Sequence, residues 1–230
     1  MRYNYIRKGI FVSRPNRFIA EVELQGTIVI AHVKNTGRCK ELLIPGCTVY
    51  LDENFDPKRK TKYDLIAVLK GEHLINMDSQ APNKVFGEWV HSGEFIEGVT
   101  HIKPECKYGN SRFDFYLEQS QCKMYVETKG VTLEHEGIAS FPDAPTLRGV
   151  KHVLELVEAV KDGYEAYVVF VIQMDYCKYF TPNDENHREF GDALREAQAK
   201  GVKIRALTCT VTPESLEITG EIPVVLDCAK

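Results

Sequence analysis

The sequence predicts an α+β protein in which a small five-stranded β-barrel precedes a mixed α/β domain with a central sheet flanked by helices. Two observations predict this order. The first 80 residues contain short alternating apolar segments separated by turn residues, which is typical of strands. From residue 81 onward, segments with helical spacing of apolar residues alternate with strand patterns. We therefore expect two domains, over residues 1–80 and 81–230.

The expected barrel strands are separated by clear turn signals. Residues 18–24 and 27–33 flank Gln25-Gly26, which predicts a hairpin. A short helical insert is expected near residues 40–43. The other expected strands cover residues 47–51, 63–69 and 73–76. Five short strands predict an OB-like (oligonucleotide-binding) barrel, although other small β-barrels have the same number of strands.

The second domain is predicted to have the element order α-β-β-β-α-β-α-β. The expected elements are a helix over residues 85–90 ended by Gly93, an extended segment over 100–107, strands over 111–117 and 122–131, a helix over 150–160, a strand over 166–173, a helix over 186–200 and a strand over 202–209. The run at residues 166–173 is almost wholly apolar, which is typical of a strand covered on both faces.

Charge is distributed unevenly along the chain. Residues 1–80 hold 13 Lys and Arg against 9 Asp and Glu, whereas residues 81–230 hold 16 against 24. A basic first part favours an anionic partner, and an acidic second part favours a bound cation. Chance imbalance in a solvated surface would give the same counts, so composition alone leaves both interpretations open.

The sequence also predicts where the protein resides. Its longest apolar run, residues 166–172, is far shorter than the roughly 20 residues that a membrane helix needs. The first eight residues are not followed by an apolar stretch and do not resemble a secretory signal. The seven cysteines are scattered and are expected to be reduced and mostly buried. We expect a soluble cytoplasmic protein with no membrane partner.

The sharpest chemical pattern joins Asp114, in one predicted strand, to Glu127 and Lys129 in the next. Alternate residues of a strand share a face, so Glu127 and Lys129 point the same way and Asp114 can lie beside them. Carboxylates suit Mg²⁺ or Mn²⁺, and the lysine can stabilise charge or help to activate an attacking water. An ordinary salt bridge of Lys129 with either carboxylate fits the same spacing.

Basic residues follow Thr146 in the first turns of a predicted helix. Arg148, Lys151 and His152 lie where the free N–H groups of a helix start favour an anion. One interpretation is a phosphate clamp beside the metal site, in which His152 carries a proton. The other is that Thr146 caps the helix and the cations are solvated.

The barrel supplies further cations in two loops. In Asn35-Thr36-Gly37-Arg38, the glycine gives backbone freedom and Arg38 is placed to reach a phosphate. The Lys58-Arg59-Lys60 run is by itself typical of a solvated loop, but on an OB-like barrel it fits a patch that binds a phosphate backbone.

Longer motifs add a resemblance to known families. The spacing of Asp114, Glu127 and Lys129 resembles the PD-(D/E)XK nuclease superfamily. Six segments together resemble the sugar fermentation stimulation protein family over nearly the whole chain. They are RPNRF (14–18), HVKNTGR (32–38), KRKT (58–61), YGNSRFD (108–114), ETKGVTL (127–133) and FPDAPTLRGVKH (141–152).

The resemblance implies an OB-like domain, a nuclease-like domain, DNA binding without sequence preference and a link to the regulation of maltose metabolism. It places Asp114, Glu127 and Lys129 at the catalytic positions. Glu105 matches a further acidic position, which would complete the metal site through a water or lie on a strand surface. The chain departs from the commoner residues of the family at Thr128, Gly130, Pro145 and Leu147.

We therefore expect a nuclease that uses Mg²⁺ or Mn²⁺, held by Asp114, Glu127 and Glu105, to hydrolyse phosphodiester bonds in DNA, with RNA as a further possible partner. The expected nucleic-acid-binding residues are Arg14, Arg17, Arg38, Arg59, Lys60, Arg112, Arg148, Lys151 and His152. One alternative is a non-catalytic DNA-binding regulator on a nuclease-like scaffold. Another is a metal-dependent hydrolase of a small phosphorylated metabolite. The strand type and the oligomeric state stay open.

Overall fold

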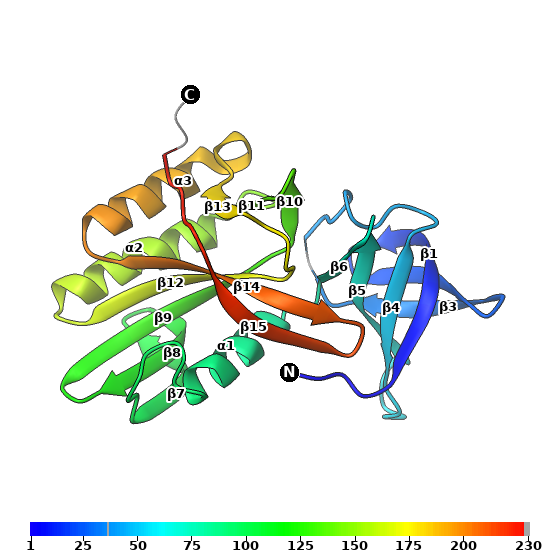
Figure 1. The fold of residues 1–230 in the computed structure, drawn as a ribbon, viewed down its shortest axis with the longest axis horizontal. Helices are drawn as coiled ribbons and strands as arrows, with labels where there is room; N and C mark the ends of the chain where they lie inside the picture. Colours follow the sequence, from blue (N-terminus) through cyan, green and yellow to red (C-terminus); the bar gives the residue numbers. More distant parts are fainter. Residues whose placement is uncertain (36, 228–230) are drawn as a thin grey trace.

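The computed structural model describes residues 1–35 and 37–227, which form two lobes (Figure 1). The first lobe is a closed barrel. Its strands are β1 (Ile6–Asn16), β2 (Ile19–Leu24), β3 (Thr27–Val33), β4 (Thr48–Glu53) and β5 (Tyr63–Lys70). Antiparallel pairing links them in the order β3-β2-β1-β4-β5, and parallel pairing of β3 with β5 closes the ring. The predicted five-stranded OB-like barrel is thus confirmed.

The strands that make up the ring differ from those expected. Strand β1 was not predicted, because only Gly9 and Phe11 of its residues are buried and the glycine carries no apolar signal. The predicted strand at residues 73–76 is β6 (His73–Asn76), which forms a hairpin with β5 outside the ring. The helical insert expected near residues 40–43 is wrong. The chain there makes tight turns in which the N–H groups of Leu42 and Leu43 share the Cys39 carbonyl.

The second lobe centres on a six-stranded sheet in the order β15-β14-β12-β9-β8-β7. Its strands are β7 (His101–Tyr108), β8 (Ser111–Gln119), β9 (Cys122–Val131), β12 (Glu165–Ile172), β14 (Lys203–Thr212) and β15 (Ser215–Ile222). Helix α1 (Ala81–His91) covers one face, and α2 (Leu147–Lys161) and α3 (Asp184–Ala199) cover the other (Figure 1). For the three helices and this sheet, the predicted order is confirmed, and β15 extends it.

The central strand β12 explains why one segment is apolar throughout. It pairs in parallel with β9 on one side and β14 on the other. Val168 and Phe170 pack into the core under α2 and α3, whereas Val169 and Val171 pack into the core under α1. Both faces of this strand are therefore buried, as the sequence predicts.

Three very short strands were not predicted from the sequence. They are β10 (Leu133–His135), β11 (Ile138–Phe141) and β13 (Tyr179–Pro182), and they form a separate sheet. Segments of three or four residues are too short to show a clear alternation. This sheet leads the chain from the end of β9 to the loop before α2, and so it sets where that loop lies.

The two lobes are joined by a buried polar cluster. Asp78, in the link between β6 and α1, is fully buried and accepts from Lys34 Nζ at 2.7 Å. Gln173, at the end of β12, donates through Nε2 to Asn76 Oδ1 at 2.8 Å and to the Asp78 carbonyl at 3.1 Å. At the other end of the chain, Tyr3 N–H donates to the Glu214 carbonyl at 2.8 Å, so the first residues lie on the second lobe. These contacts hold the barrel against the sheet.

Two expectations about the whole chain can be compared with the described residues. Within that part of the chain, no helix is long and apolar enough to cross a membrane. The six described cysteines are free thiols, and four of them are buried. This agrees with the prediction of reduced, mostly buried cysteines.

Candidate active site

A pocket of about 300 Å³ opens where the ends of β8 and β9 meet the first turns of α1 and α2. Asp114, Glu127 and Lys129 all line it, together with Arg148 and His152. The structure thus brings the three predicted catalytic side chains into one pocket. It lies beside the contact between the lobes, since Ser79 of the inter-lobe link also lines it.

Glu127 is the most enclosed of the three, with 3% of its surface exposed. Its Oε1 accepts hydrogen bonds from Lys129 Nζ and from His152 Nδ1, the latter at 2.5 Å. Its Oε2 is also buried but has no hydrogen-bond partner among the described residues. A buried polar atom without a partner costs about 1–3 kcal/mol. This oxygen of a pocket-lining residue therefore lacks a partner within the described part of the protein.

The surroundings of Glu127 keep it ionised. Burial by itself would raise the pKa of this carboxyl, but the hydrogen bond from His152 and the charge and hydrogen bond of Lys129 outweigh burial and hold the pKa below its ordinary value. Because a carboxylate only accepts, His152 Nδ1 carries the proton. Arg148 Nε donates to His152 Nε2 at 3.4 Å, so His152 links Arg148 to Glu127.

Asp114 lies where β8 and β9 separate. Their pairing ends at Phe115 and Val126, and beyond this point Asp114 turns to the next residues of β9. Its Oδ2 accepts from the N–H and the hydroxyl of Thr128 at 2.8 and 2.9 Å, and its Oδ1 accepts from Asn83 Nδ2 at 2.8 Å. The pocket lies where the pairing of β8 with β9 ends, and these hydrogen bonds fix the orientation of the Asp114 carboxylate.

Burial, and after it the charge of Glu127, raises the pKa of Asp114, although the bonds from Thr128 and Asn83 and the charge of Lys129 oppose the rise. A cation held between the two carboxylates would remove that repulsion. Asn83 and Thr128 were not among the predicted site residues. Thr128 lies between Glu127 and Lys129 in the sequence, and Asn83 follows Pro82 in the first turn of α1. Neither position in the sequence indicates that the side chain bonds to Asp114.

Glu105 occupies a different position from the other acidic residues. It lies opposite Asp114 on β7 with φ 52°, and its side chain is 66% exposed and 3.4 Å from Arg112 Nη1. It lines an adjoining cavity of about 570 Å³ that Asp114 also borders, but not the pocket that contains Glu127. Among the described residues, no group of three or more His, Cys, Asp and Glu side chains is arranged to hold a metal ion.

The basic residues at the start of α2 have different surroundings. Thr146 Oγ1 accepts from Gly149 N–H at 3.0 Å and caps the helix. Arg148 is exposed at the pocket, and Lys151 lies 3.6 Å from Glu155 of the same helix with an exposed side chain. His152 is buried against Glu127 instead of facing the surface. The predicted cap and the predicted cations therefore occur together.

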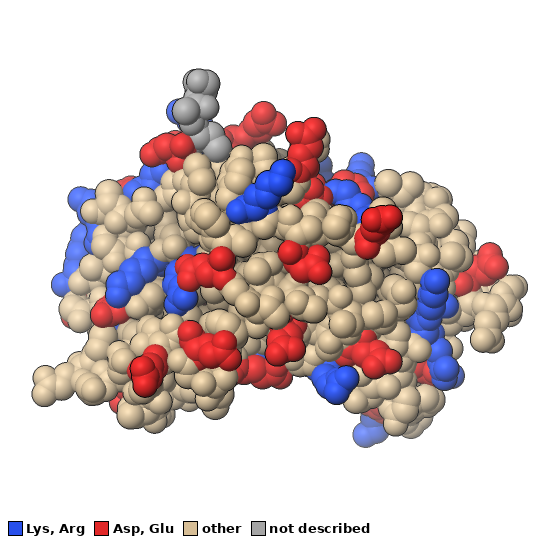
Figure 2. All heavy atoms as spheres, in the orientation of Figure 1, with Lys and Arg blue, Asp and Glu red and all other residues tan. Residues whose placement is uncertain are grey.

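The barrel arginines are also unequal. Arg14 donates to the carbonyls of Arg38, Arg17 and Asn35 at 2.6, 2.7 and 2.9 Å. Arg59 donates twice to Asp64, once at 2.9 Å. Arg17, Arg38 and Lys60 of the barrel are exposed, and so is Arg112 on β8 of the second lobe. Figure 2 shows Lys and Arg mixed with Asp and Glu over both lobes, so in this face the basic excess of residues 1–80 forms no surface of one sign.

Comparison with known proteins identifies the family. A family model described as "Sugar fermentation stimulation protein RE domain" matches residues 80–215, and one described as "SfsA N-terminal OB domain" matches residues 12–77. A sugar fermentation stimulation protein homolog of Clostridium beijerinckii is 57% identical over 226 residues, which cover 98% of this chain and 100% of the relative. The homolog of Desulfitobacterium hafniense is 62% identical over 226 residues, which cover 98% and 99%.

A solved structure has the same fold. It is described as "The structure of Pyrococcus Furiosus SfsA in complex with Ca2+", and it matches with a TM-score of 0.89 and 31% identity over 98% of both chains. A match of this extent includes both lobes. This chain therefore belongs to the sugar fermentation stimulation protein family.

Proposed function

We propose that this protein is a divalent-metal-dependent nuclease that hydrolyses phosphodiester bonds in DNA. The observation that carries the proposal is the buried Glu127 Oε2, which has no hydrogen-bond partner among the described residues, in a side chain that lines the same pocket as Asp114. A salt bridge alone would account for Lys129 and Oε1, but it leaves this second oxygen without a role.

The residues of the pocket fit a hard cation. Asp114 and Glu127 offer carboxylate oxygens, and Mg²⁺ is often held by one or two carboxylates while waters and substrate phosphate fill its other positions. The absence of a three-residue ligand group among the described residues is compatible with this mode of binding. The Pyrococcus furiosus relative in complex with Ca²⁺ supports a site for a hard cation in the family. Such a metal, when bound, would polarise a phosphate oxygen and lower the pKa of a bound water.

The chain's own residues have distinct roles in this proposal. Lys129 lies against Glu127 and stabilises the negative charge that develops on the phosphate. His152 holds Glu127 through Oε1, which leaves Oε2 to the pocket. Asn83 and Thr128 orient Asp114. Arg148, at the pocket edge, supplies positive charge for an incoming phosphate.

One observation favours the alternative of a DNA-binding regulator without catalytic activity. Lys129 and His152 both bond to Glu127 Oε1, so the charge of Glu127 has protein partners without any metal. In that case the nuclease-like lobe would serve as a scaffold and the barrel would bind DNA. A role in the regulation of sugar metabolism, including maltose, is compatible with either function.

The deciding experiment is a cleavage assay with single- and double-stranded DNA in Mg²⁺, in Mn²⁺ and in EDTA. We expect cleavage that requires metal and is lost in Asp114→Asn, since a neutral amide is a poorer ligand for a hard cation. Asp175→Asn, an exposed position on the same lobe, is the matched control.

DNA binding without metal should survive Asp114→Asn or become tighter, because a carboxylate that repels the backbone is gone. If the wild type cleaves neither substrate and calorimetry finds no metal affinity that depends on Asp114, the scaffold alternative holds. Inhibition of cleavage by oligonucleotides, compared with small phosphorylated compounds, distinguishes a nuclease from a metabolite hydrolase.

A further inference from the structure

A second cavity, of about 480 Å³, lies between two barrel loops and the loop that precedes α2. Arg17, Arg38 and Lys40 supply the cations of its lining, and Cys39, Leu43 and Ala144 supply apolar surface. Because Ala144 belongs to the second lobe, both lobes form this inter-lobe cavity.

The loops that carry the two cavity arginines are held by backbone contacts, and the cations of the cavity form no ion pairs among the described residues. Arg14 donates to the backbone carbonyls of Arg17, Asn35 and Arg38, so one guanidinium fixes both loops that carry the exposed arginines. Among the described residues, no carboxylate lies within ion-pair distance of Arg17, Arg38 or Lys40. Arg17, Arg38 and Lys40 therefore all line one cavity, and the Arg17 guanidinium also lies 5.0 Å from the centroid of the Phe18 ring.

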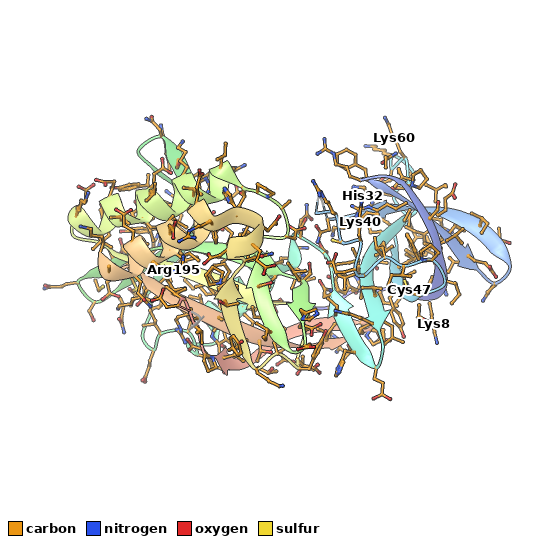
Figure 3. All side chains as sticks on the ribbon, turned by 90° about the horizontal axis from the view of Figure 1, so that it is seen from above. Lys8, His32, Lys40, Cys47, Lys60 and Arg195 are labelled. Atoms are coloured by element: carbon orange, nitrogen blue, oxygen red, sulfur yellow. The ribbon has the colours of Figure 1, made fainter. Side chains whose placement is uncertain are left out.

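The second basic loop of the barrel gives a contrast. There Arg59 is paired with Asp64, and Lys62 is 2.6 Å from Glu53. Figure 3 shows Lys60 at the outer side of the barrel, away from Lys40, which lies nearer the second lobe. Two cations of that loop are therefore paired, whereas Arg17, Arg38 and Lys40 line the inter-lobe cavity without an ion pair among the described residues.

The inter-lobe cavity adjoins the active-site pocket. Ala144 lines the former and Thr146 the latter, and two residues of chain span at most about 7 Å. The barrel loop packs closely on this segment. A Cβ on Gly37 would lie 2.2 Å from Asp143 Oδ2, so glycine is the residue that allows this approach. Asp143 thus places a negative charge at the edge of the cavity.

We propose that the inter-lobe cavity is a second phosphate-binding site, which holds one unpaired nucleotide of a DNA strand that continues into the active-site pocket. This inference rests on the proposed nuclease function. The phosphate would lie against Arg17, Arg38 and Lys40, and the sugar or base would cover the apolar floor. The volume is within the range of roughly 300–1,000 Å³ found for small-ligand pockets. A hollow of this kind admits an unpaired nucleotide, whereas a base in a duplex is held by its partner.

The test measures DNA binding by fluorescence anisotropy in EDTA, so that nothing is cleaved. The probe is a short labelled single strand with either a 5′-phosphate or a 5′-hydroxyl. The variant combines Arg17→Ala, Arg38→Ala and Lys40→Ala, and the control combines Lys107→Ala, Lys123→Ala and Lys200→Ala, which are exposed lysines outside the cavity. We expect the cavity variant to bind about tenfold more weakly, and its salt slope to fall by about 0.7 for each phosphate that it no longer neutralises.

The two probes distinguish an internal phosphate from a terminal one. Equal losses for both probes identify an internal phosphate, and a loss confined to the 5′-phosphate probe identifies a terminal one. Asp143→Asn should tighten binding, because it removes a negative charge beside the phosphate. An unchanged affinity, or the same loss in the control, overturns the proposal. The proposal is also overturned if an unlabelled duplex of the same sequence competes with the labelled strand as well as the unlabelled single strand does. If the cavity variant binds normally while metal-dependent cleavage still requires Asp114, this inference fails and the nuclease function stands.

Discussion

The active-site pocket and the barrel surface use charge in opposite ways. In the pocket, Glu127 is buried and bonded to Lys129 and His152, so each charged group depends on another. On the barrel, Arg17 and Arg38 are exposed and are in contact with water. Removing a buried charge leaves its partners unsatisfied, whereas removing an exposed one changes long-range attraction only slightly. We therefore expect larger effects from substitutions in the pocket than from substitutions on the barrel.

The largest effect is expected for Glu127→Gln. The amide loses the charge that a hard cation requires and leaves Lys129 without its counter-ion, so cleavage should fall by at least about 10³-fold. Rates of DNA cleavage in saturating Mg²⁺ check this, with Glu158→Gln on the exposed side of α2 as the matched control. Cleavage within about tenfold of the wild type would remove Glu127 from the catalytic group.

Lys129→Ala should lower the cleavage rate by roughly 10²–10³ while metal affinity is retained, because the lysine stabilises charge and is not a metal ligand. Single-turnover kinetics and calorimetry with Mn²⁺ measure the two quantities separately. Lys123→Ala, at the start of the same strand, should change neither. A loss of metal affinity equal to the loss of rate would show instead that Lys129 only keeps Glu127 in place.

A substitution at the contact between the lobes should have an intermediate effect, measured on stability. Glu134 accepts from Lys70 Nζ and from the Tyr176 hydroxyl, both at 2.8 Å, and from Gly137 N–H at 2.7 Å. Glu134→Ala leaves these donors unsatisfied, so we expect the free energy of unfolding to fall by about 2–3 kcal/mol. Urea denaturation checks this. A fall of less than about 0.5 kcal/mol would mean that water replaces the carboxylate at this contact.

The same carboxylate predicts a pH dependence. Burial raises the pKa of Glu134, but the hydrogen bonds from Lys70, Gly137 and Tyr176 outweigh burial and hold the pKa below its ordinary value. The ionised form is therefore favoured by folding, and the stabilisation is complete above the ordinary value of about 4.3 and is lost as the pH falls through the lowered pKa. The difference in stability between the wild type and Glu134→Gln should shrink on acidification. A constant difference contradicts the assignment.

The smallest effect is expected at the paired loop of the barrel. The double variant Arg59→Ala, Asp64→Ala removes both members of an ion pair and leaves the net charge unchanged, so the salt slope of DNA binding should not move. Arg38→Ala should lower the slope by about 0.7 if Arg38 contacts a phosphate of a single strand. An equal fall of the salt slope in the two variants would mean that both loops bind the DNA backbone.

Local sequence patterns were enough to predict many of the strands and the charged residues of the active-site pocket. The apolar run at residues 166–172 became a strand buried on both faces, and the spacing of Asp114, Glu127 and Lys129 was enough to predict that they converge. Alternation and helical spacing work here because each element buries one defined face. Strand β1 shows no such alternation, since one of its two buried residues is a glycine, and β10, β11 and β13 are too short to show a period.

Only the tertiary structure decided which charges are available. Arg14 and Arg59 look like free cations in the sequence, but Arg14 is bonded to carbonyls up to 24 residues away and Arg59 is bonded to Asp64. His152 faces Glu127 because α2 packs over β9, and Glu127 Oε2 is left without a partner among the described residues by the same packing. Residue type and spacing determine which charges a chain carries. The partner of each charge depends on distances across the fold, and these distances decide whether it binds a ligand or holds the structure together.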